Sequence, residues 1–110
     1  SAAKAAEAQL AKILAIENGK FGIRSNIVNP DAIFEGSKLW STEVKEQRAK
    51  AHGIDVESLE SFYASRNLLN KRILSDDVAE AVLFLAGPRS SKTTGTMLQV
   101  DAGLRDAFPR

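Results

Sequence analysis

Cysteine is absent from the 110-residue chain, and histidine, tryptophan, tyrosine and methionine occur once each. The lack of cysteine excludes disulfide bonds and thiolate metal sites. Apolar runs are short, with AVLFLAG the longest, so the sequence predicts no membrane-spanning segment. We expect a protein of the reducing cytoplasm, where a chain without cysteine is at no disadvantage.

Neither sign of charge dominates the chain. The chain has 15 basic and 14 acidic residues, which gives a net charge of +1 at pH 7. This balance argues against nucleic acid or an anionic membrane as the main partner. Apolar residues make up 44% of the chain, enough for a packed core. We therefore expect a folded domain, or part of one, that acts on small molecules or on other proteins.

Hydrophobic spacing predicts a helix at the start of the chain. Its apolar stripe consists of Ala3, Ala6, Leu10, Ile13 and Leu14. Asn18-Gly19 should end the helix, because glycine adopts the left-handed conformation beyond a last turn at little cost. A strand should follow over Ile23–Val28 and stop at Pro30, which has no N–H to donate to a ladder.

Residues 37–70, called the insert below, should form a helical excursion. Ser41 and Asp55 are expected N-caps of two amphipathic helices, about 42–52 and 56–66. A tight α/β unit would have only a short loop at this place. We therefore expect a lid or a substrate-binding segment.

The last third of the chain predicts another helix and another strand. Ser75 should cap the helix, with acidic residues in the first turn where the helix dipole favours negative charge. Gly87 should end it, and a strand should span Thr96–Val100. The inward face of the helix should carry Val78, Val82, Leu85 and Ala86.

Two strands joined through a helix should be parallel neighbours with a right-handed crossover. Parallel strands need neighbours at their edges and helices on both faces. We therefore expect residues 1–110 to be the C-terminal portion of a doubly wound α/β domain.

Several stretches, in one order and spacing, resemble the C-terminal part of the short-chain dehydrogenase/reductase family. The chain opens SAAK where that family has Tyr-Ser-Ala-x-Lys, so Lys4 takes the lysine position and the tyrosine would precede Ser1. GIRSNIVNPDAI is similar to the family's Gly-Ile-Arg-x-Asn-x-Val-x-Pro-Gly strand. DDVAEAVLFLAG, TTGTMLQ and VDAG are similar to its last helix, turn and strand.

Finer details resemble one subgroup, the dehydrogenase portion of bifunctional rhamnulose-1-phosphate aldolase/short-chain alcohol dehydrogenase proteins. They are NPDAI, EGSKLW, RSSKTTG and the AFPR ending. The resemblance implies a Rossmann-like doubly wound parallel sheet and the interconversion of an alcohol and a carbonyl with NAD or NADP, NAD being favoured. Lactaldehyde, in rhamnose metabolism, is the candidate substrate.

The resemblance also implies partners of the same kind of chain. Family dimers and tetramers use the lysine-bearing helix on one axis and the last helix and strand on another. We expect a homo-oligomer with the helix at 78–86 and the strand at 96–100 in a two-fold interface. The missing N-terminal part of the same protein is a further expected partner.

Lys4 is the candidate catalytic residue. A tyrosine four positions earlier would lie on the same helix face, where a lysine lowers the phenol's pKa and fits it for general acid/base work. The resemblance adds that Lys4 hydrogen-bonds the nicotinamide ribose. The alternative is a solvated helix lysine, as we expect Lys12 to be.

The loop after the first strand supplies the candidate cofactor contacts, because ligands of open α/β sheets bind outside the carboxyl ends of the strands. They are Pro30, Asp31, Ala32, Ile33 and Ser37. By resemblance, the backbone of Ile33 contacts the nicotinamide carboxamide, and Ser37 replaces a hydroxyl that the family has at the position of Glu35. Asp31 stands where the family often has glycine. An ordinary strand-ending turn is the alternative.

Trp40, Phe62 and Tyr63 are candidate substrate contacts, since the insert should lie beside the site. Aromatic residues at helical spacing also commonly form local core, which is the alternative. His52 has no partner that would complete a metal site, so no metal is expected.

The chain contains no Gly-x-x-x-Gly-x-Gly phosphate-binding loop. We therefore expect that these 110 residues alone bind neither NAD nor NADP appreciably and are inactive. A function of another class stays open, namely a non-catalytic α/β module that self-associates through its exposed helices.

Overall fold

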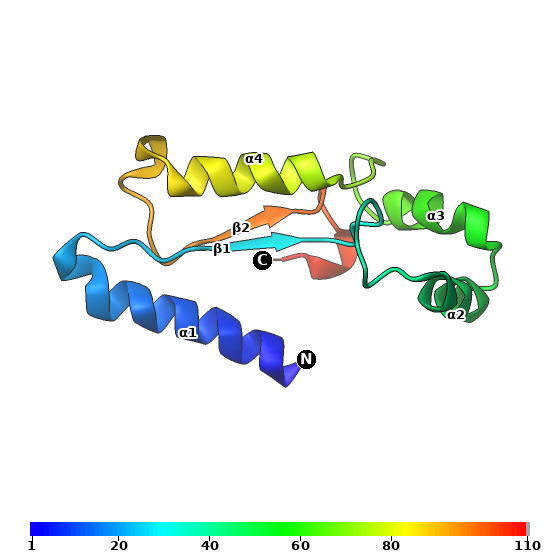
Figure 1. Ribbon diagram of the computed structural model, residues 1–110, viewed down its shortest axis with the longest axis horizontal. Coiled ribbons are helices and arrows are strands. Elements are labelled where there is room, and N and C mark those ends of the chain that lie inside the picture. The colour runs from blue at the N-terminus through cyan, green and yellow to red at the C-terminus, as the bar shows by residue number, and fades with distance from the viewer. Residues whose placement is uncertain (110) are drawn as a thin grey trace. The chain divides into compact units, whose positions relative to one another are not determined.

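A computed structural model describes residues 1–109 of the chain. It divides into two compact units (Figure 1). The first unit joins Ser1–Asn29 to Val78–Gln99, and the second joins Pro30–Asp77 to the residues from Val100 onward. Within residues 1–109, none of the helices has the length and apolar character that crossing a bilayer requires.

Two short strands form a parallel sheet, as the sequence predicts (Figure 1). They are β1 (Ile27–Pro30) and β2 (Met97–Val100). The amide of Ile27 donates to the carbonyl of Thr96 over 2.9 Å, and the amide of Asp31 donates to the carbonyl of Val100 over 3.3 Å. The second donor and the second acceptor each lie four residues after the first, in the same direction along both strands. This is the pattern of a parallel ladder.

The segment before β1 binds the turn before β2 mainly through side chains, beside one backbone bond from the Gly95 N–H to the Ser25 carbonyl at 2.7 Å. The Arg24 guanidinium donates to the Ser90 hydroxyl at 3.0 Å and to the carbonyls of Gly87 at 3.2 Å and Thr93 at 3.3 Å. The side-chain amide of Asn26 donates to the carbonyl of Thr93, and its oxygen accepts from the Thr96 N–H. Regular pairing therefore begins only at Ile27, and the predicted strand Ile23–Val28 begins four residues too early and ends two residues too early.

Helix α1 (Ala2–Asn18) and helix α4 (Ser75–Ala86) run on opposite sides of the strand pair (Figure 1). The buried face of α1 is made of alanines. Ala15 is buried, and a Cβ added to Gly95 would lie 3.7 Å from its Cβ. The Ser25 hydroxyl donates to the carbonyl of Ala11 over 2.9 Å.

The apolar stripe predicted for α1 lies on the face of the helix that points away from the strands. The stripe is exposed: Ala3, Ala6, Leu10, Ile13 and Leu14. Alanine packs against the strands because its small side chain permits close approach of the backbones. The larger apolar side chains are left on the opposite face.

The end of α1 also differs in detail from the prediction. The helix ends at Asn18, but Gly19 is right-handed with φ −56° and opens a 3-10 turn, η1 (Gly19–Phe21). The left-handed residue is Gly22, with φ 76°. The predicted end of the α-helix at Asn18 is confirmed, whereas the left-handed glycine stands one turn later than predicted because a 3-10 turn intervenes.

Helix α4 begins one residue earlier than predicted. Ser75 is its first helical residue, and the side chain of Asp77 does the capping by accepting from the Leu74 amide over 2.8 Å. This is the reaching-back half of a capping box. On the inward face Leu85 is buried and Val78 half-buried, as predicted.

The other two residues of the expected inward face, Val82 and Ala86, are exposed. Two strands are too narrow to cover the full width of a helix. The prediction for these two residues is therefore wrong within this chain.

In the second unit, α2 (Thr42–His52) and α3 (Leu59–Ser65) form the helical hairpin predicted for the insert. The Ser41 hydroxyl accepts from the Val44 amide over 3.3 Å, which confirms the predicted N-cap. The second helix starts with a 3-10 turn, η2 (Val56–Ser58), so its α-helical part is shorter than predicted.

The C-terminal segment pairs with the end of the insert. The amide of Leu68 donates to the carbonyl of Gly103 over 2.9 Å, and Asn67 and Leu104 form an antiparallel bridge. Two further 3-10 turns are η3 (Pro88–Ser90) and η4 (Arg105–Ala107). Of the AFPR ending, Arg110 lies outside the described residues.

We expect Arg24→Met to lower the free energy of unfolding of the full-length protein by about 2–3 kcal/mol, because a charged donor with several acceptors is lost. Urea denaturation measures the change. Arg89→Met removes an exposed arginine from the turn that Arg24 contacts. It is the matched control and should change stability little. Equal effects of both substitutions would contradict the role given to Arg24.

Candidate functional site

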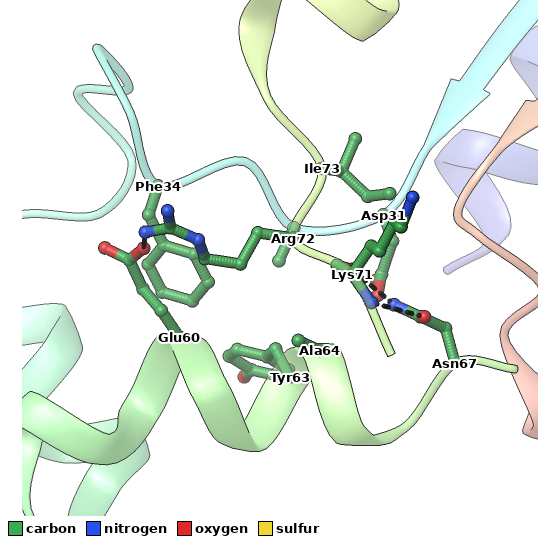
Figure 2. Close-up of a pocket in the computed structure, with 10 residues that line it drawn as sticks. Asp31, Phe34, Glu60, Tyr63, Ala64, Asn67, Lys71, Arg72 and Ile73 are labelled. Atoms are coloured by element: carbon green, nitrogen blue, oxygen red, sulfur yellow. Dashed lines mark hydrogen bonds and ion pairs between the residues drawn. The ribbon is translucent and has the colours of Figure 1, made fainter. Parts of the chain in front are cut away.

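The loop that follows β1 forms one wall of a small cavity in the second unit (Figure 2). The cavity has a volume of about 10 Å³, room for about one water molecule. Its lining comes from this loop, from α3 and from the segment before α4: Asp31, Ala32, Phe34, Glu60, Tyr63, Ala64, Asn67, Lys71, Arg72 and Ile73.

Two wider surface hollows, of about 440 and 480 Å³, adjoin the cavity's residues. Phe34, Lys45, Glu60 and Arg72 line both of them. Each hollow therefore combines an aromatic ring with charged groups of both signs. Such walls suit a small polar organic molecule that presents carbon on one side and oxygen atoms on another.

The structure places the expected cofactor residues along one turn. Asp31 and Ala32 line the cavity, and Ile33 follows them half-buried. Pro30 is the last residue of β1 and is exposed. The Ser37 hydroxyl accepts from the backbone two residues on, at 3.3 Å, so it also stabilises its own turn.

The expected substrate residues belong to one aromatic cluster, but only Tyr63 among them lines the cavity. The ring of Phe34 lies 4.3 Å from that of Trp40 and 5.3 Å from that of Tyr63, and the latter two rings are 5.5 Å apart. Phe62 stacks on His52 at 4.5 Å. Trp40 and Phe62 therefore take part in ring packing and do not line the small cavity.

Cations surround the aromatic cluster. The Lys45 ammonium lies 5.9 Å from the centre of the Phe34 ring, and the Arg66 guanidinium lies 4.8 Å from that of Tyr63. The Arg72 guanidinium pairs with the Glu60 carboxylate at 3.0 Å. Because both partners of this pair are well exposed, it contributes at most about 1 kcal/mol to stability and can be rearranged by a ligand.

Sequence reasoning missed most of the cavity wall. Phe34 carried a signal, since it is an aromatic residue directly after the loop expected at the site. Glu60, Asn67, Lys71 and Arg72 carried none, because their approach to the loop depends on how the chain after α3 folds back.

Lys4 lies in the first unit, whereas the loop lies in the second. It stands in the first turn of α1, and its side chain is 80% exposed. Its ammonium is 3.5 Å from the equally exposed Glu7 carboxylate. A loose pair of this kind leaves the lysine available to another acceptor.

Residues 1–109 contain no group of three or more metal-binding side chains placed to hold an ion. The single histidine, His52, has its ring against Phe62.

Comparison with known proteins identifies the family. A family model described as "Enoyl-(Acyl carrier protein) reductase" matches residues 1–105. The chain belongs to the short-chain dehydrogenase/reductase family. It is 46% identical, over 110 residues, to the uncharacterized oxidoreductase YuxG of Bacillus subtilis, covering all of this chain and 16% of that protein.

Solved structures agree with the fold. A 4-hydroxyisoleucine dehydrogenase complexed with NADH has 26% identity and a TM-score of 0.73. The L-sorbose reductase of Gluconobacter frateurii, complexed with NADPH and L-sorbose, has 25% identity and a TM-score of 0.76. Each comparison covers 96% of this chain and 39% of the other. The parallel strand pair with its helices is thus part of a Rossmann-like α/β fold, and the chain spans well under half the length of these relatives.

We expect Tyr63→Ala to loosen the insert in the full-length protein, because it removes the ring that contacts both Phe34 and Trp40. Loss of these and of its contacts with His52 and Phe62 should speed limited proteolysis within residues 37–70 by about tenfold. Tyr63→Phe keeps the ring and is the matched control, with proteolysis unchanged. Equally slow cleavage of the alanine variant would show that the cluster does not hold the insert together.

Proposed function

We propose that the full-length protein is a nicotinamide-dependent oxidoreductase that interconverts an alcohol and a carbonyl compound. The observation that carries the proposal is the family match over residues 1–105. The structure adds a half-buried loop and a hollow beyond the carboxyl end of a parallel strand, which is where open α/β sheets bind ligands.

The cofactor is NAD or NADP, with NAD favoured, and it would supply the hydride acceptor or donor. Related structures that contain NADH and NADPH support the class of cofactor. The chain's residues fit such a group. Lys4 would donate to ribose hydroxyls, the backbone at Ile33 would meet the carboxamide, and Pro30, Asp31, Ala32 and Ser37 would complete the loop that covers the ring.

Lys4 has a second task in this proposal. Its positive charge would lie one helical turn from a tyrosine that precedes Ser1 and would hold that phenol ready to move a proton to or from the substrate oxygen. The loose contact of Lys4 with Glu7 supports this, because no strong partner has to be broken first.

The substrate is a small alcohol or aldehyde, and we propose lactaldehyde, in rhamnose metabolism, as the candidate. Support comes from the segments that resemble the dehydrogenase portion of the aldolase fusion proteins. The hollows beside Phe34 offer a ring face and charged hydrogen-bonding groups, a fit for hydroxylated carbon chains. Tyr63 would contact the substrate directly, with Trp40 and Phe62 behind it. The insert, residues 37–70, would be the substrate-binding lid.

We propose a homo-oligomer that also contains the N-terminal part of the domain, in the cytoplasm. Large apolar side chains on α1 and α4 are exposed in the single chain, including Leu10 at 59% and Leu83 at 67%. Such surfaces favour association. They are also what the alternative, a non-catalytic self-associating module, would use. Light scattering of the full-length protein should show more than one subunit, and a monomer would contradict this part of the proposal.

We expect Lys4→Met in the full-length protein to lower turnover by about 10²–10³-fold, which corresponds to about 2–4 kcal/mol of transition-state stabilisation. The assay follows NADH oxidation with lactaldehyde. Lys12→Met, on the same helix and exposed, is the control and should keep normal turnover. Near-normal turnover of Lys4→Met would identify Lys4 as a surface lysine.

A further inference from the structure

Asn67 is the most buried polar residue beside the cavity, with 2% of its surface exposed. The donor and the acceptor of its side-chain amide both bind the backbone of one residue, Lys71. The amide group donates to the carbonyl of Lys71 over 2.8 Å, and the amide oxygen accepts from the Lys71 N–H over 3.1 Å. Figure 2 shows both bonds between the residue that follows α3 and the irregular segment before α4.

This pair of bonds closes the loop 67–71 as a backbone pair would. Leucine could fill the same volume without either bond, and aspartate could keep only the bond from the Lys71 N–H while ionised. Asn67 is itself held, because its backbone N–H donates to the carbonyl of Ala64 and its backbone forms the bridge with Leu104. The clamp is thus anchored on α3 and on the C-terminal segment.

The residue that benefits is Arg72. It directly follows the clamped Lys71 and precedes Ile73, which is buried with 9% exposure. Its backbone is therefore fixed on both sides, although its side chain is largely exposed. Arg72 lines the small cavity and both hollows, and its guanidinium lies 3.0 Å from the Glu60 carboxylate.

We propose that Asn67 is a positioning residue for substrate binding, which clamps Lys71 so that Arg72 presents its guanidinium to an oxygen atom of a hydroxylated alcohol or aldehyde. This rests on the proposed function and names the chemistry of its substrate. The fixed backbone lowers the entropy cost of substrate binding, because only the outer part of the Arg72 side chain has to be ordered. The reacting carbon and the proton transfer do not involve Asn67.

The test is a double-mutant cycle in the full-length protein, with lactaldehyde and NADH as probes. Asn67→Leu and Arg72→Met should each raise KM for lactaldehyde about five- to tenfold, with kcat changed less than twofold. The double variant should be no worse than Arg72→Met, because Asn67 acts through Arg72. KM for NADH should stay constant in all of them.

Two further variants make the result readable. Asn70→Gly alters an exposed residue of the same loop whose φ of 50° suits glycine, and its KM should be unchanged. If Asn67→Leu does not fold, Asn67→Asp takes its place in the cycle. An unchanged KM, or effects that multiply in the double variant, would make the clamp purely structural. Absence of turnover in the unaltered protein would instead overturn the proposed function.

Discussion

The parallel pairing of β1 with β2 is the constraint on which the rest of the structure depends. Because the two strands point the same way, the loop beginning at Asp31 and the turn beginning at Asp101 both leave the sheet at its carboxyl edge. The loop then provides a cavity wall. The turn leads into the segment that pairs with the end of the insert, so both segments that leave this edge belong to the second unit.

Polar side chains do much of the work that backbone ladders do elsewhere in α/β folds. Arg24 and Asn26 join the entry of β1 to the turn before β2. Asn67 closes its loop, and the Asp101 carboxylate accepts from the Gly103 amide over 2.9 Å. Each bond bridges a place where the chain changes direction. These bonds stabilise the segments next to the short strands, where the backbone ladder stops.

The sequence predicted the order of elements well, since that order follows from local signals. The Ser41 cap and the acidic first turn of α4 both stand where residue chemistry requires them. Predictions that needed to know what lies opposite were poorer. Val82 and Ala86 are exposed because two strands do not cover the full width of α4, and β1 starts late because the side chains of Arg24 and Asn26 bind the turn before β2.

The candidate site shows the same division. The loop after β1 could be located from the strand and its proline, whereas Asn67 and Arg72 could not, because their place depends on a fold-back between two helices. Trp40 and Tyr63 lie in ring contact, but periodicity alone cannot separate a pocket lining from local packing. Family membership then supplies the chemistry that a cavity alone leaves open.

The central claim is that the loop after β1 covers a nicotinamide cofactor, and hydrogen–deuterium exchange of the full-length protein tests it most directly. Saturating NADH, with NADPH as a parallel sample, should slow exchange of the amides at residues 31–34 while those of α2 are unaffected, because the backbone at Ile33 would donate to the cofactor. Unchanged exchange at residues 31–34, in a protein shown by titration to bind either cofactor, would contradict the account.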